Sequence, residues 1–129
     1  MGDLISHVRE FAEPLADEKQ LILLFEYEKT LETLVLKPET RQNLYYIFRE
    51  AFNNAIKYSY CTTIEVRFLV EKRRFFIEIK DDGHGFDFEK IKRGEGLQNM
   101  TRRAAEIGGE LKFETAEGRG TQVLVEVPV

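Results

Sequence analysis

Four groups of polar residues and glycines stand at the ends of apolar stretches in this 129-residue chain. Between them they supply carboxylates that could bind a purine base, an amide oxygen for a metal ion and cations for phosphate groups. Their glycines would let the backbone approach a ligand closely. No single group is decisive, but the order and spacing of all four favour an ATP pocket. The groups are Glu50/Asn54/Lys57, Asp81–Gly85, Gly94–Asn99 and Gly118–Thr121.

The first group lies on a helical stretch, where each residue advances by about 100°. Glu50, Asn54 and Lys57 therefore fall within about 60° of one another, beside the apolar stripe of that helix. The Asn54 amide oxygen could complete the oxygen shell of Mg²⁺, Lys57 could meet phosphate charge, and Glu50 could accept a proton or hold a water molecule. The alternative is a solvated helix face with a local polar network.

The second group begins with Asp81, which shares the phase of the apolar side chains in the alternating segment 75–79. Because alternate strand residues point to one face, we expect this carboxylate to point into the core, where it needs a donor. The amino group of adenine would supply the donor, whereas guanine would present a repelling carbonyl oxygen. Gly83 and Gly85 would leave room for the flat base. A plain turn after a strand is the alternative.

The third group places two glycines directly before a helical stretch. Free N–H groups at the positive end of a helix can form a phosphate cradle. An asparagine in the first turn could add an amide, and the cations Lys90, Lys92 and Arg93 upstream could neutralise a triphosphate, although a solvated loop would explain those cations as well. The residues that we assign to this role are Lys92, Arg93, Gly94, Gly96, Leu97 and Asn99.

The fourth group ends in Gly120 and Thr121, at the start of the last alternating stretch. Thr121 shares the phase of the valines at 123, 125 and 127, so we expect its hydroxyl to face inward near Asp81. Plain strand packing would explain the threonine equally well.

Apolar periodicity predicts the elements that position these groups. Three- and four-residue spacing predicts helices, and short apolar or alternating runs predict strands. The pattern indicates an α+β two-layer sandwich, with a mixed, mostly antiparallel sheet covered by helices on one face. The predicted helices cover 3–13, 38–59 and 97–107, and the predicted strands include 21–25, 33–36, 64–70, 75–79, 111–113 and 123–127.

Length and composition fit one domain, with residues 1–37 as an N-terminal helix and strands and residues 38–129 as the nucleotide-binding core. A net charge of −4 argues against a nucleic-acid partner. Cys61 is the single cysteine, which excludes an internal disulfide and favours a cytoplasmic location. No apolar run approaches about 18 residues, so we expect no membrane contact by this domain. The Met1-Gly2 start suggests a piece of a longer protein.

The ordered motifs resemble the GHKL superfamily of ATP-binding domains, over about residues 38–129. The run Arg49–Ser59 is similar to the asparagine box of that family, and Asp81–Phe86 and Gly94–Met100 are similar to its first and second glycine boxes, with Gly120-Thr121 closing the set. The resemblance implies a Bergerat-type fold, with Asp81, Gly83, Gly85, Phe86, Gly120 and Thr121 around ATP, and Asn54 on Mg²⁺.

The short segment between Phe86 and Gly94 resembles sensor histidine kinases of the nitrate-sensor and LytS-like groups. That resemblance implies transfer of the γ-phosphoryl group to a histidine on a separate dimerisation domain of the same protein, and then to a downstream response regulator. His7 and His84 lack the expected acceptor context, so the acceptor domain is expected upstream of this chain. The resemblance also implies a cytoplasmic location, including the cytoplasmic part of a membrane-bound bacterial sensor.

Two other functions remain open from the residues. An anti-sigma-factor-type serine kinase would use the same pocket on a chain of similar length. A nucleotide-sensing interaction module would bind ATP without transferring phosphate. The role of Glu50, as a base or as a ligand of metal-bound water, is open as well.

Overall fold

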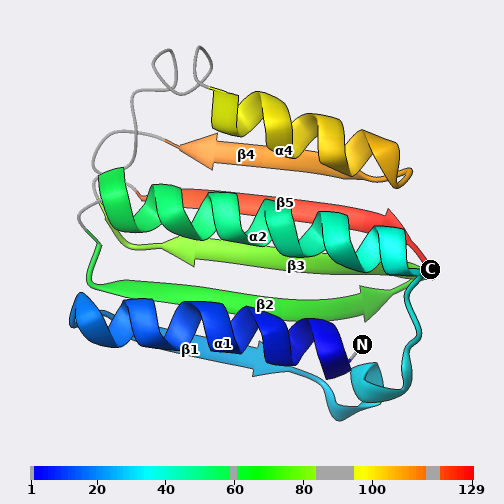
Figure 1. The fold of residues 1–129 in the computed structure, drawn as a ribbon, viewed down its shortest axis with the longest axis horizontal. Coiled ribbons are helices and arrows are strands. Elements are labelled where there is room, and N and C mark those ends of the chain that lie inside the picture. The colour runs from blue at the N-terminus through cyan, green and yellow to red at the C-terminus, as the bar shows by residue number, and fades with distance from the viewer. Residues whose placement is uncertain (1, 59–60, 84–94, 116–119) are drawn as a thin grey trace.

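The computed structural model describes residues 2–58, 61–83, 95–115 and 120–129. Within these ranges, one five-stranded sheet carries three α-helices on one face (Figure 1). The elements are α1 (Gly2–Glu18), β1 (Ile22–Tyr27), the 3₁₀ helix η1 (Lys29–Thr33), α2 (Pro38–Tyr58), β2 (Thr63–Glu71), β3 (Arg74–Asp81), α4 (Glu95–Glu106), β4 (Glu110–Thr115) and β5 (Thr121–Pro128).

The sheet has the strand order β1-β2-β3-β5-β4. β1 runs parallel to β2, and the three other pairs of neighbours are antiparallel. α1 packs on β1, α2 on β3 and β5, and α4 on β4 and β5. The predicted α+β sandwich with a mixed, mostly antiparallel sheet is therefore confirmed.

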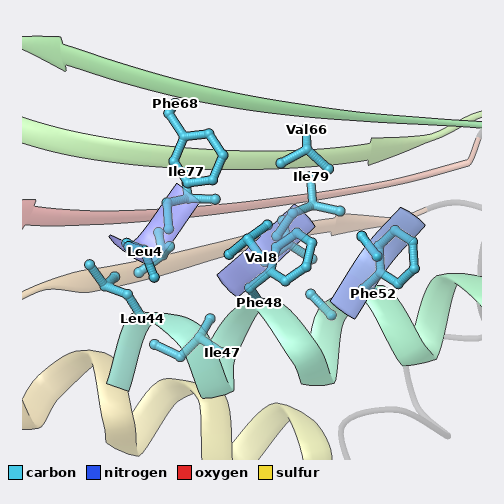
Figure 2. Close-up of a cluster of buried hydrophobic side chains, with 14 of the residues drawn as sticks. Leu4, Val8, Leu44, Ile47, Phe48, Phe52, Val66, Phe68, Ile77 and Ile79 are labelled. Carbon is cyan, nitrogen blue, oxygen red and sulfur yellow. The ribbon is translucent and has the colours of Figure 1, made fainter. Parts of the chain in front are cut away.

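The core lies between the helices and the sheet (Figure 2). On β2 and β3, buried residues alternate with partly exposed ones, which is the pattern of a sheet that is covered on one face. α2 faces these strands with the apolar residues that recur every three or four positions, among them Phe48 and Phe52, whose rings stack at 5.5 Å. This packing holds α2 rigidly over the strands that carry the site.

The first helix continues beyond the predicted end at residue 13. Pro14 lies inside α1 and is exposed, whereas Ala12 and Ala16 on either side of it are buried in the core. The free energy gained by burying Ala12 and Ala16 exceeds the loss of the backbone hydrogen bond that proline cannot donate. The helix ends instead in a left-handed cap at Gln20, where the Leu21 N–H donates to the Ala16 carbonyl oxygen at 2.8 Å.

The strand predicted over residues 33–36 is absent. The chain forms η1 and then an irregular segment, in which Val35 is 87% exposed while Leu31 and Leu36 are buried. A short apolar run does not by itself distinguish a strand from an irregular segment in which only some of the side chains are buried. The other predicted elements are present, and α4 ends as expected in a left-handed cap at Gly108.

The described members of the four candidate groups belong to elements that meet at one end of the sheet (Figure 1). The last turns of α2, the end of β3, the first turn of α4 and the start of β5 all lie at this end, on the left in the view. The fold therefore brings together segments that are far apart in the sequence.

Candidate functional site

Asp81 is the last residue of β3 and is only 5% exposed. It continues the alternation of buried residues on that strand, so the expected inward orientation is confirmed. Its Cα partner on β5 is Thr121, which is 6% exposed and also points inward as expected. The Gly83 N–H donates to Asp81 Oδ1 at 2.9 Å, which fixes the carboxylate at the start of the following loop.

Gly120 lies directly on the backbone of Asp81. Its φ of +78° is in the left-handed region, and a β-carbon at this position would collide with the Asp81 carbonyl oxygen. Next to it, the Thr121 hydroxyl shares a hydrogen bond of 2.9 Å with the Thr115 hydroxyl. Glycine is therefore required here for the close approach of two chain segments, one of which carries the buried carboxylate.

Asp82 ties the end of β3 to the start of β2. Its Oδ1 accepts hydrogen bonds from the backbone N–H groups of Thr62 and Thr63 at 2.8 and 2.9 Å, and its Oδ2 accepts one from the Thr62 hydroxyl at 2.7 Å. These bonds, with the one from the Thr63 backbone the strongest, lower the pKa of Asp82 below its ordinary value of 3.8. Sequence patterns did not identify this role of Asp82, because its partners lie about 20 positions away along the chain.

A cavity of about 250 Å³ opens beside Asp81. It lies between the ends of β3, β4 and β5, and its lining combines inward-facing residues such as Asp81 and Thr121 with residues of the opposite phase such as Lys80. Its lining residues are Lys80, Asp81, Glu114, Thr115, Gly120, Thr121 and Gln122.

Glu50 on α2 reaches the first turn of α4. A β-carbon on Gly96 would collide with the Glu50 carboxylate, so the glycine is what allows this approach. The carboxylate is half-buried and lies near the positive end of α4. Asn54 and Lys57 follow on the last turns of α2, where Asn54 is partly buried and Lys57 is exposed.

A second pocket, of about 240 Å³, lies between α2 and α4. It brings Glu50 and Asn99, which the sequence assigned to a nucleotide site, together with residues that the sequence analysis did not single out. Among these, Arg103 donates to Asn43 Oδ1 at 3.2 Å, and its guanidinium lies 4.5 Å from the centre of the Tyr46 ring. The lining residues are Tyr46, Arg49, Glu50, Asn53, Asn99, Met100 and Arg103.

Several predicted site residues lie outside the part of the chain that the structure describes. These are Gly85, Phe86, Lys92, Arg93 and Gly94. Within the described ranges, no group of three or more histidine, cysteine, aspartate or glutamate residues could hold a metal ion. The assignment of Mg²⁺ to Asn54 therefore stays a prediction, as do the ligand roles of the other residues.

Comparison with known protein families gives a match over residues 39–129, to the family described as histidine kinase-, DNA gyrase B-, and HSP90-like ATPase. Two curated Bacillus subtilis proteins are similar in sequence. Sensor histidine kinase LiaS is 28% identical over 123 residues, which cover 95% of this chain and 34% of LiaS. Sensor histidine kinase YdfH is 37% identical over 99 residues, which cover 74% of this chain and 24% of YdfH. The chain thus spans about a third or less of these relatives.

Solved structures show the same fold. The histidine kinase domain of the blue-light activated histidine kinase from Erythrobacter litoralis EL346 aligns with a TM-score of 0.81 and 17% identity, over 97% of this chain and 60% of that one. The histidine kinase AdeS from Acinetobacter baumannii aligns with a TM-score of 0.79 and 16% identity, over 98% and 64% of the two chains.

Proposed function

Because this chain belongs to the family of histidine kinase-, DNA gyrase B- and HSP90-like ATPases, we propose that it is the ATP-binding catalytic part of a bacterial sensor histidine kinase. In this proposal all 129 residues form one catalytic domain. The domain binds Mg-ATP and donates the γ-phosphoryl group to a histidine on a separate dimerisation domain of the same protein. The named relatives are sensor histidine kinases, which favours this function over a serine kinase or a nucleotide sensor.

The observation that carries the proposal is the buried carboxylate of Asp81 at the open end of the sheet. A carboxylate in such a position is stabilised by a donor, and the amino group of adenine is a donor of the right kind. We take the cavity that Asp81 lines with Gly120 and Thr121 as the place where the base would enter, next to Gly83, whose N–H donates to the Asp81 carboxylate. Gly85 and Phe86 would complete this end of the pocket.

The other end of the nucleotide is assigned to α2 and the first turn of α4. The half-buried amide of Asn54 suits Mg²⁺, which prefers oxygen ligands and keeps several water molecules. Lys57 is exposed at the same end of α2 and can meet phosphate charge. Gly96, Leu97 and Asn99 offer the start of α4 to the triphosphate, and Lys92, Arg93 and Gly94 would neutralise it from the preceding segment.

Phosphoryl transfer depends mainly on position and charge neutralisation. The bond between the γ-phosphorus and its bridging oxygen breaks, a bond to an imidazole nitrogen of the acceptor forms, and that imidazole gives up a proton. Glu50 on α2 is half-buried beside the start of α4, within reach of the space proposed for the terminal phosphate. It would organise a metal-bound water molecule or accept the proton.

The wider context of the domain follows from the same proposal. The phosphohistidine would pass its phosphoryl group to a downstream response regulator, in the cytoplasm. Among the residues that the structure describes, no helix is long and apolar enough to cross a membrane.

The proposal is tested by incubating the full-length gene product with γ-labelled ATP and Mg²⁺. Phosphate on histidine, which is labile in acid and stable in base, is the expected result. Phosphate on serine would support the serine kinase instead, and ATP binding without any transfer would support the nucleotide sensor.

A further inference from the structure

Two arginines in the pocket between α2 and α4 have no carboxylate partner among the residues that the structure describes. Within the described residues, neither Arg49 nor Arg103 forms an ion pair. The other arginines in those ranges pair with an aspartate or a glutamate, except for Arg73 in the turn between β2 and β3. Arg49 and Arg103, without an ion pair in the described ranges, thus both line one pocket, in a chain whose net charge is −4.

Aromatic rings hold both guanidinium groups in place. Arg103 lies over the Tyr46 ring at 4.5 Å. The Arg49 guanidinium lies 5.9 Å from the same ring, 5.8 Å from that of Tyr45 and 5.0 Å from that of Phe11 on α1. Arg49 Nε is buried and makes no hydrogen bond in the described part of the chain. Tyr46 itself is 38% exposed. Both cations are therefore fixed by cation–π contacts, which leave most of their N–H donors available to an anion.

The residue types of this surface are those of a protein interface. Tyrosine and arginine are enriched among the residues that contribute most to binding between proteins. α2 and α4 lie side by side on the helical face of the sheet (Figure 1), and residues of both helices line the pocket. Glu50 and Asn99 line that same pocket, so a partner seated there would reach the residues proposed to act on the terminal phosphate.

We propose that this pocket docks an acidic helical segment of the histidine-bearing dimerisation domain, with Arg49 and Arg103 binding its carboxylates. This inference rests on the proposed function. The triphosphate has its own assigned cations at the start of α4 and on α2, so the two arginines are not needed for it. A nucleic acid would need a wider basic face than this chain offers. Acidic side chains bound here would place the acceptor imidazole at the Glu50 end of the pocket.

Charge reversal in the full-length gene product tests the inference. Arg103→Glu is expected to slow phosphohistidine formation by about tenfold or more, because a like charge would then face the acidic partner. Its ATP affinity is expected to stay within about twofold of the wild-type value, since the residue lies outside the proposed nucleotide site. Raising the salt concentration should slow the wild type more than the variant.

Arg102→Glu is the matched control. Arg102 is the neighbouring residue on α4, it is exposed, and it pairs with Glu106 outside the pocket. Its reversal is expected to leave transfer unchanged. Arg49→Glu, on the other helix of the pocket, is expected to repeat the effect of Arg103→Glu and guards against a local folding defect at either position.

The outcomes separate this inference from the proposed function. Normal transfer by both charge-reversed variants would overturn the docking surface and leave the kinase intact. Weaker ATP binding by either charge-reversed variant would also overturn the docking surface, because it would assign the pocket to the nucleotide. An equal loss of transfer in Arg102→Glu would show a general charge effect. If the wild type forms no phosphohistidine, the proposed function fails and the docking surface fails with it.

Discussion

The carboxylate of Glu50 lies so close to the α-carbon of Gly96 that any side chain at residue 96 would collide with it. A glycine that first suggests a phosphate cradle thus also serves contact between α2 and α4. The contact joins Glu50, which we propose acts on the terminal phosphate, to α4, the helix that follows the proposed phosphate-binding segment.

Replacing Gly96 with alanine is expected to destabilise the fold by only about 1 kcal/mol or less, because the added methyl group displaces the flexible end of the Glu50 side chain rather than the backbone. Helix propensity alone would favour alanine by about 1 kcal/mol. In a Glu50→Ala background the collision is removed, so the same substitution should become neutral or stabilising. Urea denaturation of the four proteins in this cycle measures the coupling, and additive effects would contradict it.

Gly120→Ala is expected to lower the free energy of unfolding by more than backbone strain alone would. Gly120 has φ +78° and no space for a β-carbon beside the Asp81 carbonyl oxygen. Gly108 is the matched control, because its φ is +72° but a β-carbon there would lie 3.9 Å from the nearest atom, in Pro128. Gly108→Ala should cost about 1–2 kcal/mol from strain, and Gly120→Ala clearly more, with weaker ATP binding. If Gly108→Ala and Gly120→Ala lost the same stability in thermal unfolding, the close approach at Gly120 would be unimportant.

The hydrogen bonds to Asp82 make a pH-dependent contribution to stability. Because folding lowers the pKa of this carboxyl, its contribution is fully present above the unfolded value of about 3.8 and is lost as the pH falls through the lower folded value. The residue is exposed, so Asp82→Ala should cost only about 1 kcal/mol at pH 7.

The difference between wild type and Asp82→Ala should shrink when urea midpoints are measured at pH values below about 4. Glu110→Ala is the control, since Glu110 is exposed and makes no side-chain hydrogen bond or ion pair with the described residues. A constant difference between pH 7 and pH 3 would show that the ionised carboxylate is not what joins the two strands.

Glu50→Gln separates chemistry from binding. The substitution keeps the size of the side chain and removes its charge, so ATP affinity should change little. Phosphohistidine formation should fall by about 100-fold if Glu50 accepts the proton. A smaller loss that excess Mg²⁺ reverses would indicate a role in holding metal-bound water. Full activity in transfer and in ATP hydrolysis would remove Glu50 from the chemistry.

Local patterns in the sequence predicted the positions of Asp81 and Thr121, because strand alternation alone decides which side chains face the core. The course of α1 past Pro14 was not predictable in this way, since the burial of Ala16 depends on the sheet beneath it. The contact of Arg103 with Tyr46, on which its proposed docking role depends, was missed for a similar reason. Its pocket exists only when α2 and α4 pack side by side.

The Asp82 hydrogen bonds and the Glu50–Gly96 contact also join segments that are distant in sequence. In both cases the residue types were visible, as an Asp-Asp-Gly turn and a glycine pair, but turn chemistry and phosphate binding explained them equally well. A pair of threonines facing an aspartate across neighbouring strands is a signal that would have identified the first, once the strand order was known.

Calorimetric titration of ATP into the wild type, Asp81→Asn and Glu78→Gln tests the central assignment most directly. Glu78 is on the same strand with the opposite orientation, so it controls for loss of a carboxylate on β3. The account predicts that Asp81→Asn weakens ATP binding by at least about tenfold, as expected for loss of a charged hydrogen-bond acceptor, while its thermal unfolding stays cooperative and Glu78→Gln binds normally. A folded Asp81→Asn protein that binds ATP with wild-type affinity would contradict it.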